Sequence, residues 1–302
     1  MNSTKFFERY FWIILLAGLI LGLIYSPYNS FIMKLLKPLL MVMLFLIFLK
    51  TDLFQILKEI TNIKLLLFLV SMYMVIIPLI FFLGINIFNR ELAIGMLLLT
   101  AMPAGVSSPT LTDIVKGNTS LSLSITIFTS LAAPFTVPFL FRFVNLQTMS
   151  LNIYEIFKDL IILVFVPLII SQILKKVFPG KINNIKHLFT PVNIIILFII
   201  VYASIGSQRN LILDNFVDII WKIGFLYLVF ILLHIIGYLI AFKQNKENKI
   251  AISIGATYVN NGMAIVLAAL YFEPAILVLM VLSEIPWNTL LGPFRRVLKY
   301  IN

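Results

Sequence analysis

The sequence predicts an all-α integral membrane protein with ten transmembrane helices. Three observations lead to this fold class: the apolar composition, the number of long apolar segments, and the uneven distribution of basic residues. Of the 302 residues, 61% are hydrophobic and 12% are charged, whereas a soluble domain carries roughly 25% charged residues. No soluble core could bury so much apolar surface, so lipid must be the solvent. The absence of cysteine excludes disulfides and thiolate metal sites.

Ten apolar segments have the length of a membrane-spanning helix, which is roughly 17–25 residues. The connections between them are short, so no soluble domain is inserted, and the segments are too long for the strands of a membrane barrel. The first segment follows Lys5 and Arg9 but lacks a small-residue cleavage site, so we expect a retained helix and not a signal peptide. The segments cover residues 10–26, 31–49, 65–84, 92–115, 121–143, 154–174, 187–206, 216–241, 249–272 and 274–292.

Basic residues gather on one side of this ten-span arrangement. An even number of spans places both termini on the same side, and most of the 23 Lys and Arg residues, Lys50, Lys175 and Lys186 among them, fall there. The positive-inside rule therefore predicts a multi-pass protein of the plasma membrane with both termini in the cytoplasm. This orientation explains the net charge of +11. We expect lipid and a small-molecule substrate as partners, no nucleic acid, and a monomer.

Two of the ten segments are interrupted by a short polar run. The fourth breaks at residues 103–110 and the ninth at residues 255–262. Irregular backbone cannot face lipid, because its N–H and C=O groups would have no partners. Both breaks must therefore be buried in protein or line a wet cavity. Paired breaks in corresponding positions of two halves point to the substrate site of a secondary transporter.

The chain divides into two halves of five spans each, at residues 1–150 and 151–302. An odd number of spans per half gives the halves opposite orientations. Pro134 and Pro286 lie in the fifth span of each half, and the offset between them also carries the first break onto the second. We therefore predict an inverted repeat. At such a crossing, half-helix N-termini suit an organic anion, while unwound carbonyl groups suit a small cation.

The residues around the breaks resemble the bile acid:sodium symporter (BASS) family and its bacterial and archaeal homologues. Residues 102–109 (MPAGVSSP), 116–118 (KGN) and 121–124 (LSLS) look like the fourth and fifth helices of that family, and residues 260–264 (NNGMA) look like the ninth. The resemblance implies a panel of spans 1, 2, 6 and 7 beside a core of spans 3–5 and 8–10. It also implies alternating-access transport of a bile-acid-like or carboxylate-bearing organic anion, coupled to sodium.

The resemblance implies two sodium sites, of which the first keeps hydroxyl ligands. Ser108, Thr126 and Ser130 match hydroxyl positions of that site, while Pro109 stands where the family has an asparagine. Gly255 stands where the family has a glutamate that serves both sites.

By the same resemblance, the second site has lost most of its side-chain ligands, since its positions hold Tyr73, Gly255 and Val259. We expect no cofactor other than, at most, a sodium ion. Because ligands are missing, coupling to protons and transport without coupling stay open as alternatives.

Glu284 is the one acidic residue deep inside a predicted span, and a carboxylate within the bilayer is a functional hypothesis by default. The repeat offset aligns it with Ala132, within a turn of Ser130, so we expect it to face the crossing. We predict that Glu284 replaces the missing glutamate as a cation ligand or proton carrier. The alternative is a neutral glutamate that stabilises a kinked helix. His234, in the eighth span, either carries protons or simply packs in the interior.

Polar side chains near the breaks are the candidate substrate ligands, although Tyr73 could equally pack in the core. The candidates are Ser107, Ser108, Thr110, Thr112, Asn260, Asn261, Tyr73 and Asn288. No nucleotide-binding loop or hydrolase motif is present, so we expect no enzyme. An anion exporter of the auxin-efflux-carrier type and a membrane sensor that binds a ligand without moving it remain alternatives.

Overall fold

The computed structural model describes residues 10–51, 62–144 and 152–300. In these ranges the chain is almost entirely helical and forms no β-strand, and its one β pairing is an isolated antiparallel bridge between Ala104 and Val259. The predicted all-α fold class is therefore confirmed. The predicted boundary between residues 150 and 151 lies outside the described residues, as do Lys5 and Arg9.

Five of the described helical stretches are long and apolar enough to cross a membrane. A sixth is reached if Pro274–Thr289 and Leu291–Val297, which meet at a bend of 42°, count as one span. These helices make the chain a multi-pass membrane protein, while the count of ten spans stays a prediction. The five stretches are Ile63–Asn86, Thr119–Phe143, Ile153–Val177, Pro179–Ser207 and Phe216–Ile240.

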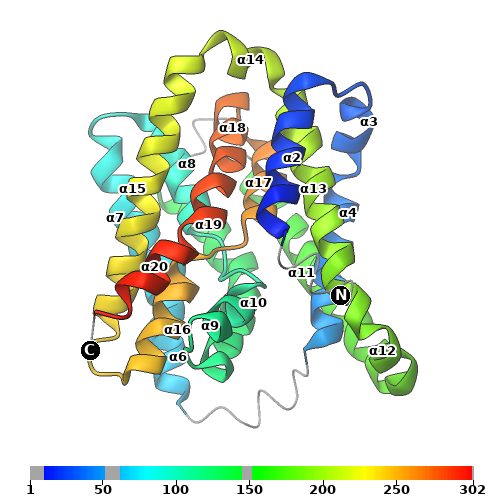
Figure 1. Cartoon of the computed structure of the whole chain (residues 1–302), viewed down its shortest axis with the longest axis vertical. Coiled ribbons are helices and arrows are strands. Elements are labelled where there is room, and N and C mark those ends of the chain that lie inside the picture. Colours follow the sequence, from blue (N-terminus) through cyan, green and yellow to red (C-terminus); the bar gives the residue numbers. More distant parts are fainter. Residues whose placement is uncertain (1–9, 52–61, 145–151, 301–302) are drawn as a thin grey trace.

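One group of helices packs around α13 (Figure 1), and we call it the panel. In it, α2 (Phe11–Ile24) packs along α13 (Phe189–Ser207), and α4 (Leu36–Lys50) packs along α11 (Ile153–Val177). Contacts between α4 and α13 join the two pairs. Short helices flank the panel: α3 (Asn29–Lys34), α12 (Pro179–Ile185), the 3-10 turn η3 (Lys186–Leu188) and α14 (Arg209–Asp214).

The other helices form a second group, which we call the core. The long helices α10 (Thr119–Phe143) and α15 (Phe216–Ile240) both contact α16 (Lys246–Thr257), and α8 (Arg90–Thr100) packs against α18 (Pro274–Leu282). The core also contains α6 (Ile63–Ser71), the π-helical turn η1 (Met72–Ile76), α7 (Ile77–Asn86), α9 (Ser108–Ile114), α17 (Asn261–Tyr271), α19 (Glu284–Thr289) and α20 (Leu291–Val297).

Asparagine caps set where several core helices begin. The side chains of Asn89, Asn118, Asn245 and Asn260 each accept a hydrogen bond from the backbone N–H three residues further on. An asparagine oxygen at this position satisfies one of the free N–H groups of the first helical turn. The starts of helices α8, α10, α16 and α17 are therefore fixed by these asparagines.

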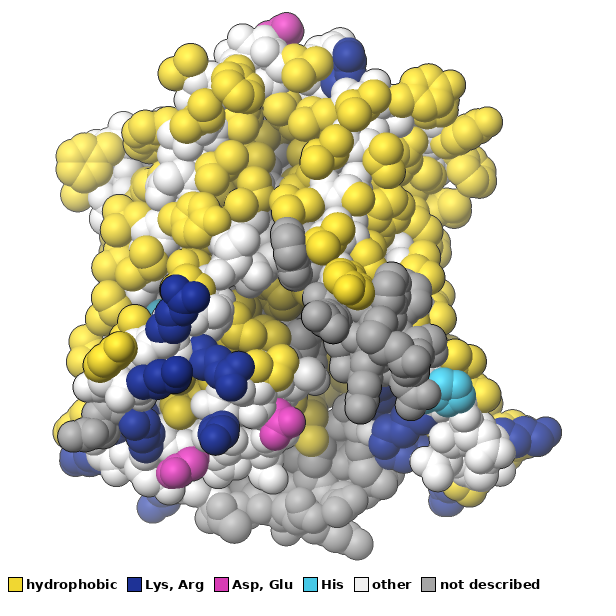
Figure 2. Space-filling view, viewed as in Figure 1, with side chains coloured by type: hydrophobic (Ala, Val, Ile, Leu, Met, Phe, Trp, Pro, Cys, Tyr) yellow, Lys and Arg dark blue, Asp and Glu magenta, His cyan; other side chains and the backbone are white. Residues whose placement is uncertain are grey.

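The outer surface is largely apolar, as expected of a surface that faces lipid. Large hydrophobic side chains are exposed on the helices, for example Phe139 at 57%, Val217 at 82% and Trp221 at 56%. Figure 2 shows that apolar side chains cover most of this face, while Lys and Arg side chains gather in its lower part. Apolar exposure on this scale is unusual for a soluble monomer and is expected for a protein in a membrane.

Candidate functional site

The two predicted interruptions are present, and their backbones pair with each other. Helix α8 ends before the first break and α9 follows it, while α16 and α17 flank the second. The Gly105 N–H donates to the Tyr258 carbonyl at 2.6 Å, and the Asn260 N–H donates to the Pro103 carbonyl at 2.8 Å. Each extended segment therefore satisfies backbone groups of the other. Irregular backbone inside a membrane protein needs hydrogen-bond partners, and here each segment supplies them to the other.

Side chains from neighbouring helices satisfy further backbone groups of the crossing. The Ala104 N–H donates to the Thr129 hydroxyl of α10 at 3.1 Å. The Trp287 indole N–H of α19 donates to the Val259 carbonyl at 3.1 Å. Because these partners lie on packed helices, the crossing is held in one geometry.

Gly105 permits the close approach of the two segments. A Cβ atom at this position would lie 2.6 Å from the Tyr258 carbonyl oxygen and 2.9 Å from the Val259 carbonyl oxygen. Both contacts are to backbone, which cannot rotate out of the way as a side chain can. Only glycine fits here without moving the crossing.

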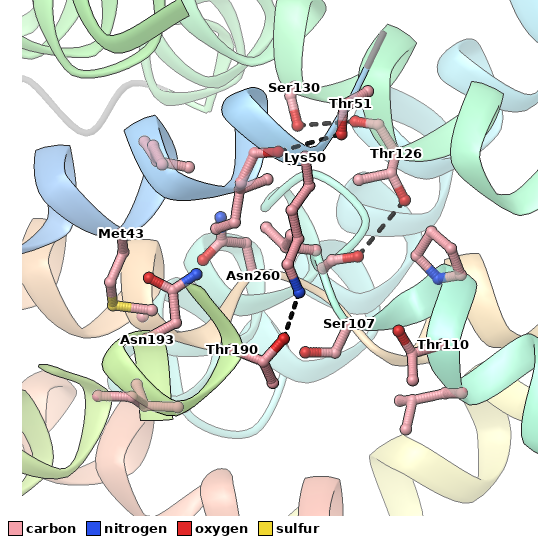
Figure 3. A pocket seen from close by; sticks show the side chains of 18 of the residues that line it. Met43, Lys50, Thr51, Ser107, Thr110, Thr126, Ser130, Thr190, Asn193 and Asn260 are labelled. Atoms are coloured by element: carbon pink, nitrogen blue, oxygen red, sulfur yellow. Dashed lines mark hydrogen bonds between the residues drawn. The ribbon is translucent and has the colours of Figure 1, made fainter. Parts of the chain in front are cut away.

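A cavity of about 640 Å³ lies between the crossing and the panel (Figure 3). This size falls in the range of small-molecule sites. Met43 and Ile47 of α4 and Leu197 of α13 give it an apolar wall, while the crossing contributes polar groups. Figure 3 shows Lys50 of α4 reaching towards Thr190 of α13, and its ammonium group donates to the Thr190 hydroxyl.

Some of the predicted site residues meet at the cavity and others do not. Those that line the cavity are Ser107, Thr110, Asn260, Asn261, Thr126, Ser130 and Glu284. Those that lie outside its lining are Ser108, Thr112, Tyr73, Asn288 and His234. Their roles in binding or coupling stay predictions, and the contacts of this second group are described next.

Ser108 and Thr112 are fully buried and bond within the core. The Ser108 hydroxyl donates to the Tyr258 carbonyl at 2.9 Å, which ties the start of α9 to the other break. The Thr112 hydroxyl donates to the Ser122 hydroxyl of α10 at 3.0 Å. Both side chains therefore stabilise the surroundings of the crossing.

Tyr73 fills the space beside Gly255. Its hydroxyl donates to the Ile252 carbonyl of α16 at 2.6 Å. A Cβ atom at position 255 would lie 3.4 Å from Cε2 of Tyr73 and 3.1 Å from a methyl carbon of Ile125. The position where the family resemblance calls for a glutamate is thus packed by a tyrosine ring and an isoleucine.

His234 lies on α15 with its ring inside the core. Its Nδ1 is 3.1 Å from the Ser253 hydroxyl, and its ring stacks on Phe294 of α20 with centroids 4.0 Å apart. Its Nε2 is buried and has no hydrogen-bond partner among the described residues. These contacts are those of a packed residue at the junction of α15, α16 and α20.

Glu284 is 1% exposed and stands at the start of α19. Its Oε2 accepts from the Asn288 amide at 3.1 Å, while its Oε1 has no partner among the described residues. Asn288 lines a small void of about 10 Å³ together with Glu284. Glu284 therefore borders both this void and the large cavity.

The cationic part of the cavity was not predicted. Lys50, Lys175 and Lys186 are explained by membrane orientation in the sequence, yet all three line the cavity. A signal for this was available, because Lys186, Thr190 and Asn193 follow an i, i+4, i+7 spacing that puts them on one face of a helix. Thr190 and Asn193 also line the cavity.

An all-helical chain with an apolar outer surface and a cavity at the crossing of two interrupted helices has the features of a secondary transporter. The chain belongs to the SBF-like CPA transporter family, whose model matches residues 9–288. This membership confirms the resemblance to the bile acid:sodium symporters. The family is by its description one of transporters, in agreement with the expectation that the chain is not an enzyme.

Three relatives show how similar the chain is to named proteins. The uncharacterized sodium-dependent transporter YocS of Bacillus subtilis (strain 168) is 28% identical over 209 residues, which cover 67% of this chain and 62% of the relative. The probable sodium/metabolite cotransporter BASS4, chloroplastic, of Arabidopsis thaliana is 30% identical over 131 residues, 41% of this chain and 30% of the relative. The sodium/bile acid cotransporter 7 of Xenopus tropicalis is 31% identical over 151 residues, 48% of this chain and 44% of the relative.

Proposed function

We propose that the chain is a secondary active transporter that moves a small organic anion by alternating access of the core against the panel. The observation that carries this proposal is the cavity of about 640 Å³, which combines an apolar wall, the polar crossing and three lysines. The relatives' names, which speak of sodium-dependent transport, sodium/metabolite and sodium/bile acid cotransport, agree with it.

The proposal includes ten spans arranged as two inverted repeats of five. On this interpretation, α8 with α9 and α16 with α17 are the interrupted spans of the two halves. The antiparallel pairing of Gly105 and Asn260 with the opposite break supports it, because inverted repeats bring equivalent segments together in opposite directions. The end of the protein that carries Lys50, Lys175 and Lys186 is then the cytoplasmic end, in the plasma membrane.

The charge of the cavity favours an anion. Among the lining residues that the structure describes, Lys50, Lys175 and Lys186 are cationic and Glu284 alone is acidic. A cleft with an excess of one sign of charge raises the local concentration of a substrate of the opposite sign. The apolar wall adds a preference for an amphipathic body, as in a bile-acid-like or carboxylate-bearing metabolite.

Coupling to sodium is the part of the proposal that rests on the crossing. Thr126 and Ser130 line the cavity, and the Thr126 hydroxyl also lies 3.4 Å from the Gly105 carbonyl oxygen. Hydroxyl and carbonyl oxygens of this kind suit a small hard cation. Proton coupling through Glu284 or His234, and transport without coupling, are the alternatives.

Flux into liposomes tests the function. The purified protein in sealed vesicles is offered radiolabelled bile acids and carboxylate metabolites, with a sodium or a potassium gradient and at two pH values. We expect saturable uptake of at least one anion, faster than in protein-free vesicles, with a sodium gradient raising the initial rate. Saturable binding without any flux would instead identify a membrane sensor and refute the proposal.

A further inference from the structure

The large cavity changes character along its length. At the crossing, Met43 of α4 and Leu197 of α13 reach the second break, since a Cβ atom at Gly262 would lie 3.8 Å from Met43 and 3.7 Å from Leu197. Lys50 lies seven residues after Met43 on α4, and Thr190 lies seven residues before Leu197 on α13. Seven residues of an α-helix span about 10 Å. The cavity lining therefore extends about 10 Å along these helices, from the crossing to Lys50 and Thr190.

An apolar stretch separates the two ends of the cavity. Ile47 of α4 and Ile194 of α13 line it between the crossing and the pair formed by Lys50 and Thr190. Ile47 is three residues from Lys50, and Ile194 is four residues from Thr190. Residues three or four apart lie on the same face of a helix. A ligand that reaches from the crossing to Lys50 therefore passes two apolar side chains.

The far end of the cavity is cationic, and we call it the lysine end. It consists of Lys50 at the end of α4, Lys175 in the last turn of α11 and Lys186 in η3, just before α13. All three residues line the cavity, so side chains from three elements border one space. Because lysine side chains are flexible, their ammonium groups can converge on one ligand.

Hydrogen bonds hold the elements of the lysine end together. The Lys50 ammonium group donates to the Thr190 hydroxyl, which joins α4 to α13 (Figure 3). The Gln172 amide donates to the Phe48 carbonyl at 3.0 Å, which joins α11 to the last turn of α4. Lys175 follows Gln172 by three residues and so lies on the face of α11 that meets α4. The backbone of the lysine end is therefore fixed within the panel.

The acidic residue of the cavity lies at the opposite end, beside the crossing. Among the lining residues that the structure describes, Glu284 alone is acidic. It directly follows Ser283, whose hydroxyl accepts from the Asn261 amide at 3.0 Å, and Asn261 begins α17 at the second break. An anionic group is attracted by the lysines and repelled by a carboxylate. The cavity therefore orients an anionic ligand with its charge at the lysine end.

We propose that the lysine end is a subsite for a doubly charged anionic head group, such as that of a phosphate monoester, and that the apolar body of the substrate extends from there towards the crossing. A phosphate monoester offers three acceptor oxygens and up to two negative charges. These match three ammonium donors better than a single carboxylate does. The inference deepens the proposed function and rests on it, because it names the class of anion that the cavity carries.

Two esters that differ in one charge test this subsite by binding alone. Butyl phosphate carries two negative charges at pH 8, because the second pKa of a phosphate monoester is about 6, whereas butyl methyl phosphate carries one. The melting temperature of the purified full-length protein in detergent is measured against the concentration of each ester at constant ionic strength, which gives two apparent dissociation constants. The wild type is expected to bind butyl phosphate at least tenfold more tightly than the diester.

Paired substitutions separate the lysine end from the general positive charge of this part of the protein. Lys175→Gln with Lys186→Gln removes two charges from the lining and is expected to reduce the preference for butyl phosphate to less than threefold. The matched control is Lys176→Gln with Lys181→Gln, which removes two charges from exposed positions outside the lining and should keep the full preference. Lys175→Arg with Lys186→Arg retains both charges and should also keep it, which guards against a Gln pair that fails to fold.

Three results would each overturn the subsite: equal affinity of the wild type for the two esters, no stabilisation by butyl phosphate, or an equal loss of preference in both Gln pairs. A lipid with the same head group is distinguished by competition. Glycerol 3-phosphate is expected to displace butyl phosphate. Displacement by phosphatidic acid in mixed micelles, but not by glycerol 3-phosphate, would assign the lysine end to a lipid and overturn its role in substrate binding.

Liposome flux distinguishes the failure of this subsite from the failure of the proposed function. Saturable uptake of a monocarboxylate, together with equal affinity for the two esters, would leave the transporter standing and remove the subsite. A preference for butyl phosphate that depends on Lys175 and Lys186, in a protein that moves no anion, would support the head-group site and refute the proposed function.

Discussion

At the scale of single residues, Gly105 leaves no room for a side chain unless the backbone moves. A methyl group there would meet two backbone carbonyl oxygens at 2.6 Å and 2.9 Å. Gly105→Ala is therefore expected to lower the free energy of unfolding by about 1–3 kcal/mol, the usual cost of overpacking. Thermal or denaturant unfolding in detergent measures this change.

Gly292→Ala is the control for this substitution, because nothing lies within 4 Å of a Cβ atom at position 292 in α20. Because alanine favours a helix more than glycine does, this variant should be at least as stable as the wild type. If Gly105→Ala is as stable as Gly292→Ala, the two segments do not approach each other as closely as described.

Removal of one lysine charge from the cavity is expected to weaken the binding of an anionic substrate moderately. Lys186→Gln removes one positive charge from the lining. An exposed charge contributes up to about 1 kcal/mol, so the KM for anion uptake is expected to rise about two- to fivefold, with less effect at high salt. Lys181→Gln, in the same short segment but outside the lining, is the control and should leave KM unchanged. A rise of the same size in both variants would show a general charge effect and not a cavity effect.

At the scale of elements, the sequence located both interruptions but not their ends. The first was predicted at residues 103–110, yet α9 already begins at Ser108 and has Pro109 in its first turn. Proline is favoured there because its missing N–H needs no partner. The second was predicted at residues 255–262, yet Gly255 remains helical and Asn260 caps the next helix. The first-turn proline of α9 and the asparagine cap of α17 therefore set where the helices resume after each interruption.

The filling of the space beside Gly255 could not be predicted from the sequence. The family resemblance places Tyr73 and Gly255 at the same ion site, but it does not indicate that the Tyr73 ring of η1 fills the space where the glutamate side chain would stand. A phenol also suits a cavity wall and a buried core equally well, so the sequence placed Tyr73 among the substrate ligands. In the structure the Tyr73 hydroxyl donates to the Ile252 carbonyl, which favours the packing role that the sequence left open.

Tyr73→Phe tests this packing role. The variant keeps the ring beside Gly255 and removes the 2.6 Å hydrogen bond to Ile252. The free energy of unfolding is expected to fall by about 1 kcal/mol, with KM for the anion unchanged. Unfolding and flux measured on the same preparation decide between the two roles. A raised KM with unchanged stability would return Tyr73 to the substrate site.

At the scale of the whole molecule, a polar link joins panel and core at the end opposite the lysines. Asp159 of α11 accepts from Lys37 of α4 at 2.5 Å and from the Tyr271 hydroxyl of α17 at 2.5 Å. Lys37 and Asp159 lie at the starts of α4 and α11, whereas Lys50 and Lys175 lie at the ends of the same helices. The link and the lysines therefore lie towards opposite ends of α4 and α11, and the link lies outside the cavity lining.

If the core moves against the panel as proposed, the hydrogen bond between Asp159 and Tyr271 must break when the protein opens at the end where this bond lies. Hydrogen bonds to charged groups contribute about 1.5–3 kcal/mol, which corresponds to about a 10- to 100-fold shift between two states. Tyr271→Phe, which leaves Lys37 bonded to Asp159, should therefore populate the outward-open state. The chain has no cysteine, so a single Ser107→Cys substitution reports access to the cavity without a background signal.

A membrane-impermeant maleimide added from outside is expected to label Ser107→Cys at least tenfold faster when Tyr271→Phe is present. Tyr202→Phe is the control, because the Tyr202 hydroxyl donates to the Tyr25 carbonyl at 3.1 Å between α13 and the end of α2, both in the panel. That bond moves with the panel and has no part in opening. Only a hydrogen bond between panel and core can favour one of the two states over the other. Equal labelling rates in the Tyr271→Phe and Tyr202→Phe variants would therefore mean that the bond between Asp159 and Tyr271 does not stabilise the closed state.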